Sequence, residues 1–219
     1  MNDPVERAVA AAVAEADVRF GTSIPEGGQA TLAAFVNELL RWNRSVNLTA
    51  ISDPAQVGEL HLLDSLAVVP HVPAGSLVAD VGTGGGFPGV PLAVARPDVR
   101  VELLDRTEKK ILFLKTTLAR LGIDNAVPRH VRLEGKRERE GLPLYDVAVS
   151  RAFAAPHEWL ALARNYVRPG GLIVTMLGAE RPDPVAWNAA LDGDRLIADL
   201  SYQLPSGHQR GLLVVQRAG

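Results

Sequence analysis

The sequence predicts an α/β protein built on a parallel sheet and preceded by a helical segment. In the later two-thirds of the chain, short apolar runs alternate with helix-like runs, a pattern typical of a parallel sheet covered by helices. One apolar run, 77–81, ends in a glycine-rich turn of the kind that binds ligands beyond a parallel strand. Earlier in the chain, apolar residues recur at helical spacing. We therefore divide the 219 residues into a helical cap at 1–72 and an α/β unit at 73–219.

The cap is expected to contain three helices. Asp3 and Pro4 form a helix start signal, an N-cap residue followed by proline at the first helical position. A second helix is expected to end near residue 43, and a third to run over 54–69. The proline- and glycine-containing stretch 70–75 then marks the boundary with the α/β unit.

The α/β unit is expected to contain alternating strands and helices, then a final pair of strands. The strands are predicted at 77–81, 100–104, 126–133, 145–150 and 172–177. The helices are predicted at 88–95, 108–121, 157–166 and 182–191. The last two strands, 197–204 and 212–217, are joined by a loop too short for a crossover, so they must be antiparallel.

Composition narrows the class of protein. Hydrophobic residues make up 47% of the chain and charged residues 22%, as in ordinary globular proteins. A net charge of −2 argues against a uniformly basic nucleic-acid binder but leaves room for a local basic patch. There is no cysteine, which excludes thiolate metal sites, and no apolar run approaches the roughly 18 residues of a membrane span. We expect a cytoplasmic protein with no metal and no membrane partner.

The glycine-rich turn contains a literal G-x-G-x-x-G at Gly84, Gly86 and Gly89. In dinucleotide folds a pyrophosphate rests on the helix that follows such a turn. Here Phe87 precedes Pro88, which is expected at the first helical position, and we expect the bulky ring to obstruct a pyrophosphate. The turn therefore suits a ligand without phosphates, such as S-adenosylmethionine. A turn with no ligand is the alternative, at a high entropic cost for so many glycines.

Polar residues at the ends of two other strands complete the candidate site. Asp105 follows the strand 100–104 and can accept both ribose hydroxyls of an adenosine, although it would serve NAD equally and can instead cap the next helix. Arg151, with Ser150 and Asp146 in YDVAVSRAF, is expected to face the crevice. Its guanidinium can hold a carboxylate or phosphate, or form a purely structural ion pair.

Several runs together resemble one known family. They are RWNRSVNLTAISDP (41–54), HLLDSL (61–66), VADVGTGGGFPGVPLAV (78–94), LLDRTEKKILFL (103–114) and YDVAVSRAF (145–153). Over residues 39–178 the chain is similar to the small-subunit (16S) ribosomal RNA guanine-N7 methyltransferase family G, also called the glucose-inhibited division protein B family. One departure is Leu60, where the family often has arginine.

The resemblance implies a class I methyltransferase (Rossmann-like) fold, with a seven-stranded, mostly parallel sheet, an antiparallel last strand and an N-terminal helical cap. It implies S-adenosylmethionine as methyl donor and guanine N7 in 16S rRNA, naked or in the small ribosomal subunit, as acceptor. We expect a monomer. The donor-binding positions that it implies are Gly82, Gly84, Phe87, Asp105, Leu133, Glu134 and Arg151.

Guanine N7 carries a lone pair and no proton, so its methylation requires no general base. We therefore assign no catalytic acid or base and regard Arg151 as a positioning candidate. RNA would need basic side chains near the crevice, each of which could equally be a solvated surface charge. The candidates are Arg106, Lys109, Lys110, Lys115, His208 and Arg210.

Two other functions remain open from the residues alone. One is an NAD-dependent oxidoreductase, against which the Phe87-Pro88 insertion and the lack of a Tyr/Lys pair for hydride chemistry argue. The other is a non-catalytic nucleotide- or RNA-binding module with a degenerate site. Polar cap residues such as Asn43, His61 and Asp64 are either substrate contacts or hydrogen bonds between cap and core.

Overall fold

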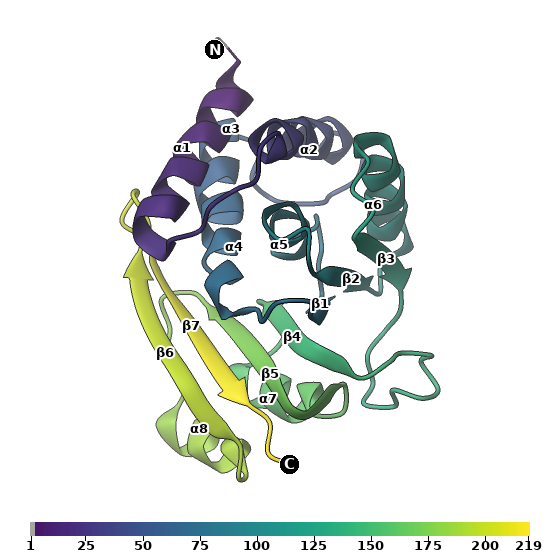
Figure 1. Cartoon of the computed structure of the whole chain (residues 1–219), viewed down its shortest axis with the longest axis vertical. Helices are drawn as coiled ribbons and strands as arrows, with labels where there is room; N and C mark the ends of the chain where they lie inside the picture. Colours follow the sequence, from purple (N-terminus) through teal and green to yellow (C-terminus); the bar gives the residue numbers. More distant parts are fainter. Residues whose placement is uncertain (1–2) are drawn as a thin grey trace.

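A computed structural model describes residues 3–219 and has a seven-stranded sheet at its centre (Figure 1). The strands are β1 (Leu77–Val81), β2 (Arg100–Asp105), β3 (Ala126–His130), β4 (Tyr145–Arg151), β5 (Val167–Leu177), β6 (Arg195–Gln203) and β7 (Gln209–Gln216). Their order across the sheet is β3-β2-β1-β4-β5-β7-β6. Strands β1 to β5 pair in parallel, whereas β7 is antiparallel to both of its neighbours. The predicted α/β fold with an antiparallel C-terminal pair is confirmed.

The helices follow the expected order with shifted boundaries. They are α1 (Pro4–Phe20), α2 (Gly28–Asn43), α3 (Pro54–Val57), α4 (Asp64–Leu66), α5 (Gly89–Ala95), α6 (Glu108–Leu121), α7 (Pro156–Ala163) and α8 (Pro184–Leu191). A 3₁₀ turn, Val69–His71, precedes β1. Helix α5 begins at Gly89, so Pro88 is its N-cap residue and not its first helical residue as predicted.

Two apolar clusters lie on opposite faces of the sheet, because successive strand residues point to opposite sides. On β1, Val78 joins the cluster that contains α1, α2, α5 and α6. Its neighbour Ala79 joins the cluster that contains α7 and Trp187 of α8. Figure 1 shows the corresponding layers, with the N-terminal helices and α6 above the sheet and α7 and α8 below it. The cap therefore packs into the same cluster as one face of the sheet.

The segment predicted as one helix over 54–69 has a different internal geometry. Between α3 and α4, residues Gly58–Leu63 form a π-helical segment (η1), in which the Asp64 N–H reaches back to the Glu59 carbonyl. Gly58 lies against α1, where a Cβ would come within 2.8 Å of the Ala8 carbonyl oxygen. Single π-helical turns are frequent at functional sites. The wider turn shifts the helical phase of the residues that follow it, including Asp64.

Two further expectations are corrected. Strand β3 ends at His130 and not at residue 133, so Leu133 and Glu134 belong to the loop that follows it. Asp146 lies near the start of β4, where it accepts from the Leu77 N–H at 2.7 Å and pairs with Arg168. It is therefore at the opposite end of the strand from Arg151. Among the described residues, no helix is long and apolar enough to cross a membrane.

Candidate functional site

The carboxyl ends of β1, β2, β4 and β5 meet at one edge of the sheet, and two cavities lie there. The cap cavity, of about 620 Å³, is bounded by the cap, the glycine loop and the ends of β4, β5 and β7. The β2 cavity, of about 580 Å³, is bounded by the end of β2, the start of α6 and the loop after β3. Both are lined by Gly82, Ala152, Phe153 and Ala154.

The glycine loop after β1 is organised by a buried carboxylate that the sequence reasoning did not single out. Asp80, with no exposed surface, accepts hydrogen bonds at Oδ2 from Thr83 Oγ1 (2.6 Å) and the Gly89 N–H (2.8 Å). Burial raises its pKa to about 6. A Cβ at Gly89 would lie 2.6 Å from Oδ2, so only glycine allows this approach. The sequence did contain a signal for this role of Asp80, because it is an acidic residue inside an otherwise apolar strand.

This arrangement changes the reason for excluding a pyrophosphate. The Phe87 ring is only 3% exposed and packs on His61 and Phe35, with ring centroids 5.0 Å and 5.6 Å away, so it does not stand over the loop. The expectation that Phe87 itself obstructs a phosphate is wrong. Instead the N-terminal end of α5 already holds the carboxylate of Asp80, and a second anion there would be repelled.

Asp105 at the end of β2 lies between the glycine loop and α6. It accepts from the Gly84 N–H at 3.0 Å through Oδ2 and from the Thr107 N–H at 2.8 Å through Oδ1. Lys110 Nζ is 4.0 Å from Oδ2. The carboxylate is buried but lines the β2 cavity. Because each carboxylate oxygen has two lone pairs, Asp105 retains acceptor capacity for a ligand while it holds the loop.

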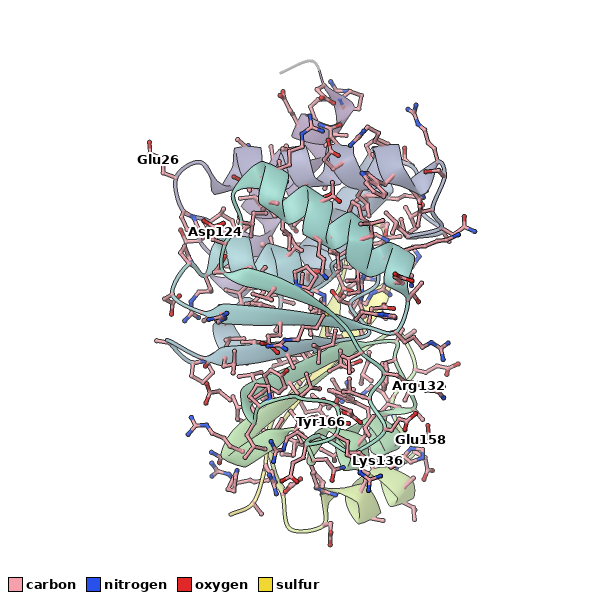
Figure 2. All side chains as sticks on the ribbon, turned by 90° about the vertical axis from the view of Figure 1, so that its right-hand side faces the viewer. Glu26, Asp124, Arg132, Lys136, Glu158 and Tyr166 are labelled. Atoms are coloured by element: carbon pink, nitrogen blue, oxygen red, sulfur yellow. The ribbon has the colours of Figure 1, made fainter. Side chains whose placement is uncertain are left out.

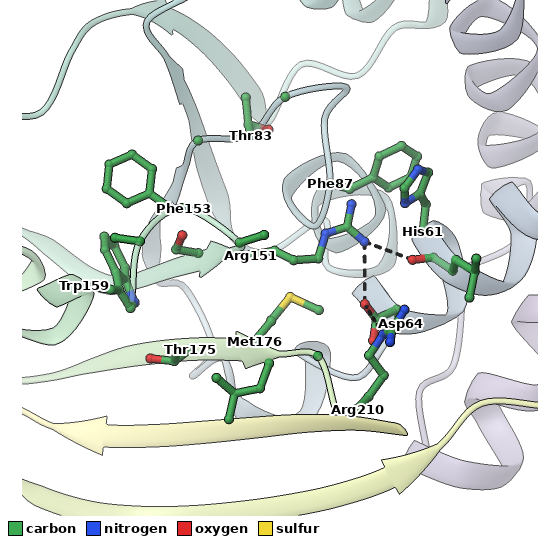
Figure 3. A pocket seen from close by; sticks show the side chains of 18 of the residues that line it. His61, Asp64, Thr83, Phe87, Arg151, Phe153, Trp159, Thr175, Met176 and Arg210 are labelled. Atoms are coloured by element: carbon green, nitrogen blue, oxygen red, sulfur yellow. Dashed lines mark hydrogen bonds and ion pairs between the residues drawn. The ribbon is translucent and has the colours of Figure 1, made fainter. Parts of the chain in front are cut away.

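Arg151 at the end of β4 is held from the cap side of the crevice (Figure 3). Its Nη1 donates to the Leu60 carbonyl at 3.1 Å and lies 3.6 Å from Asp64 Oδ2. Its Cζ is 5.7 Å from the centroid of the Phe87 ring. Leu60, the residue that departs from the family pattern, therefore binds Arg151 through its backbone carbonyl and not through its side chain. Arg151 also lines the cap cavity.

A second buried carboxylate, Asp64 in α4, joins four segments of the chain. It is 2% exposed, pairs with Arg151 and also with Arg210 of β7 at 3.5 Å, and accepts from the Tyr202 hydroxyl of β6 at 2.7 Å. Burial raises the pKa of Asp64, and the two arginines oppose that shift. The sequence left the role of this residue open, and the structure makes it the counterion of two cavity-lining guanidinium groups.

His61 lies between Phe87 and the cap loop and is neutral. Its Nε2 is 2.7 Å from Thr49 Oγ1, and burial together with the nearby Arg151 lowers its pKa to about 4. Asn43 holds the cap loop, because its side chain forms hydrogen bonds with the backbone of Leu48 and Thr49. Among the described residues, no cluster of His, Cys, Asp or Glu could hold a metal.

The remaining predicted positions divide between the cavities and the surface. Leu133 lines the β2 cavity, together with Arg106 and Lys110. The Glu134 carboxylate lines neither cavity and lies 3.7 Å from both Arg132 and Lys136. Figure 2 shows Arg132 and Lys136 on the same side of the molecule, on the loop that follows β3.

Two lysines and a histidine predicted to bind RNA lie outside both cavities. Lys109 and Lys115 are exposed on α6, and His208 is exposed in the β6–β7 turn, where its Nδ1 is 2.7 Å from Ser206 Oγ. Sequence reasoning missed Phe153 and Thr175, which line the cap cavity. Nothing in a single sequence indicates that these two residues line one cavity, or that Phe153 contacts Gly82.

Comparison with known proteins gives a consistent result. The family model for rRNA small subunit methyltransferase G matches residues 28–191. Ribosomal RNA small subunit methyltransferase G of Myxococcus xanthus is 45% identical over 84% of this chain and 85% of its own length. The protein of that name from Anaeromyxobacter dehalogenans is 43% identical over 86% and 87%. An O-methyltransferase from Bacillus cereus, solved in complex with SAH, shares the fold with a TM-score of 0.59 and 18% identity, over 95% of this chain and 100% of its own.

Proposed function

We propose that this chain, which belongs to the rRNA small subunit methyltransferase G family, transfers the methyl group of S-adenosylmethionine to N7 of a guanine in 16S rRNA. The observation that carries the proposal is the pair of cavities that share Gly82, with the buried acid Asp105 at one side and the partly buried Arg151 at the other. We also propose that the protein acts as a monomer. An rRNA substrate would place the protein in the bacterial cytoplasm.

The residues present fit this donor. Asp105 has acceptor capacity for the ribose hydroxyls, and Leu133 supplies an apolar wall for the adenine in the β2 cavity. Gly82 lines both cavities and Gly84 lines the cap cavity, so the backbone can approach the donor there without side chains in the way. Arg151 can hold the donor's carboxylate in the cap cavity, beside Phe87. We assign no donor contact to Glu134, because it lines neither cavity.

The fit also separates this donor from NAD. S-adenosylmethionine carries no phosphate, and the end of α5 that would bind a phosphate is filled by Asp80. An unpartnered atom, Asp80 Oδ1, lies buried below the loop and could accept from an ordered water that also contacts the donor. These features favour an adenosyl ligand without a pyrophosphate and disfavour the oxidoreductase alternative.

When bound, the donor supplies an electrophilic methyl group on a sulfonium. The chain has only to align that methyl with the N7 lone pair, and alignment of this kind contributes on the order of 7–11 kcal/mol. No crevice residue is needed as a base. Asp64 and Asp105 already accept hydrogen bonds from other parts of the chain, and His61 has a pKa of about 4. We therefore assign them to holding the site.

RNA binding is assigned to positive charge around the crevice. Arg106 and Lys110 line the β2 cavity, and Arg210 lines the cap cavity on the other side. Lys109 and Lys115 extend this positive surface along α6, and His208 lies near Arg210. Phosphates bound by such side chains release counterions, so RNA affinity should fall as salt is raised.

The test is methyl transfer to small-subunit particles from a strain that lacks this activity. Labelled S-adenosylmethionine should yield 7-methylguanine in 16S rRNA, located by mass mapping of fragments. Titration calorimetry with S-adenosylhomocysteine and NADH provides the ligand control, and only the former should bind. Tight NADH binding, or donor binding without transfer to any rRNA, would contradict the proposal.

A further inference from the structure

The Phe153 ring lies directly on Gly82, at the place where the two cavities meet. A Cβ built on Gly82 would be 2.8 Å from Phe153 Cδ2, so the ring edge already touches this backbone. The ring packs edge-on against Trp159, with centroids 5.8 Å apart, and is 41% exposed (Figure 3). No ligand atom can pass between this ring and Gly82.

A donor bound as proposed has to cross this point. Its adenosine would lie in the β2 cavity near Asp105, and its amino-acid end in the cap cavity near Arg151. The residues that line both cavities are Gly82, Ala152, Phe153 and Ala154. The ring therefore stands in the path of the donor.

The local structure allows the ring to leave. Phe153 follows Ala152, which has a φ of +53°, a left-handed conformation that is unfavourable for alanine. The ring is 41% exposed and belongs to neither apolar cluster, so its displacement leaves the core in place. Rotation of the strained segment would also relieve the positive φ. Displacement of Phe153 is therefore a small change at the end of β4.

The cap cavity also contains polar groups without partners. The hydroxyls of Ser150 and Thr175 are buried and make no hydrogen bond, and the two residues are direct neighbours on β4 and β5. Both line the cap cavity together with Phe153, Trp159 and Met176. Two adjacent free hydroxyls and aromatic walls suit the edge and the face of a nucleobase.

We infer that Phe153 is a positioning residue that couples the two substrates, an inference that rests on the proposed function. Binding of the donor displaces the ring from Gly82 towards the cap cavity, where it forms one wall of the acceptor-base site above Ser150 and Thr175. The donor then binds before the RNA and strengthens RNA binding. By linkage, RNA strengthens donor binding by the same factor.

The ring can be followed directly by ¹⁹F NMR. The chain has five phenylalanines, so 4-fluorophenylalanine labelling gives five resonances, and Phe153→Leu identifies the one of interest. Saturation with S-adenosylhomocysteine should shift the Phe153 resonance and leave that of Phe113, which packs between Phe35 and Trp42 in the core, in place. An unshifted Phe153 resonance in the saturated protein overturns the inference alone. Failure of S-adenosylhomocysteine to bind removes the proposed function as well.

Binding measurements provide the second test. In the wild type, unmethylated small-subunit particles should bind at least about fivefold more tightly with saturating S-adenosylhomocysteine than without it. In Phe153→Ala that ratio should fall to one, while the affinity for S-adenosylhomocysteine is unchanged or a few-fold tighter. Leu144→Ala is the matched control, because Leu144 is 42% exposed and lines neither cavity. A coupling ratio that persists in Phe153→Ala overturns the inference.

Discussion

His61 offers a quantitative test of how the cap packs against the crevice. In the folded protein it is neutral, with a pKa of about 4 against an ordinary value of 6.5. Its Nε2 is 2.7 Å from Thr49 Oγ1 and its ring stacks on Phe87. The perturbation is His61→Gln, which keeps a polar atom near the position of Nε2 and does not titrate.

The magnitude follows from linkage. The folded pKa lies below the unfolded value, so unfolding takes up a proton and the stabilisation is complete above pH 6.5 and lost as the pH falls towards 4. The full shift corresponds to about 3.4 kcal/mol, and the loss between pH 8 and pH 5.5 to about 1.4 kcal/mol. His61→Gln should lack this loss.

Asp80 produces a smaller effect of opposite sign, because its pKa is raised to about 6. Between pH 8 and pH 5.5 it should add about 0.8 kcal/mol to the stability of both proteins. The comparison of His61→Gln with the wild type removes this common part. Urea unfolding at pH 5.5, 6.5 and 8 measures the difference directly. If both proteins lose equal stability on acidification, His61 is not held neutral by the packing described here.

Three further predictions follow from the crevice. Asp105→Asn should weaken S-adenosylhomocysteine binding about 10- to 150-fold by calorimetry, as expected when a charged acceptor is lost. Asp98→Asn is the control and should leave this affinity unchanged, because Asp98 also accepts from a backbone N–H, that of Gly75, but lines neither cavity. Asp64→Asn should lower the free energy of unfolding by about 3–5 kcal/mol because two guanidinium groups lose their counterion. Adding Arg210→Gln should recover part of that loss in the same urea experiment, and no recovery would refute the shared pairing. Lys109→Gln should reduce the salt slope of RNA binding by about 0.7 to 0.9, and an unchanged slope would remove this residue from the RNA surface.

The sequence predicted the parts of the site that follow from strand direction. Asp105 and Arg151 each follow an apolar run, and parallel strands bring their carboxyl ends to one edge. The glycine loop was recognisable because so many glycines in one turn indicate a backbone conformation, or a close approach to a ligand, that side chains would prevent. Both features follow from the local order of residues and from the parallel arrangement of the strands, and a single sequence is enough to predict these.

The features that were missed depend on contacts between distant segments. The sequence left Asp64 as either a substrate contact or a hydrogen bond between cap and core, and the π-helical turn before it shifts the helical phase from which its partners would be predicted. Arg210 and Tyr202, which contact Asp64, lie more than a hundred residues later in the chain. The ring of Phe153 reaches Gly82 through the path of one loop, and no periodicity encodes that path.

The predicted cap and the α/β unit share both an apolar cluster and ion pairs in the structure. Residues of α1 and α2 share one apolar cluster with β1, β4, β5 and β7. Asp64, on the cap side of the boundary, is the counterion of Arg151 and Arg210 on the other side. Without the cap, the crevice would keep two arginines with no buried acid between them. The division near residue 72 stays a prediction, and the charge balance of the crevice depends on residues from both sides of it.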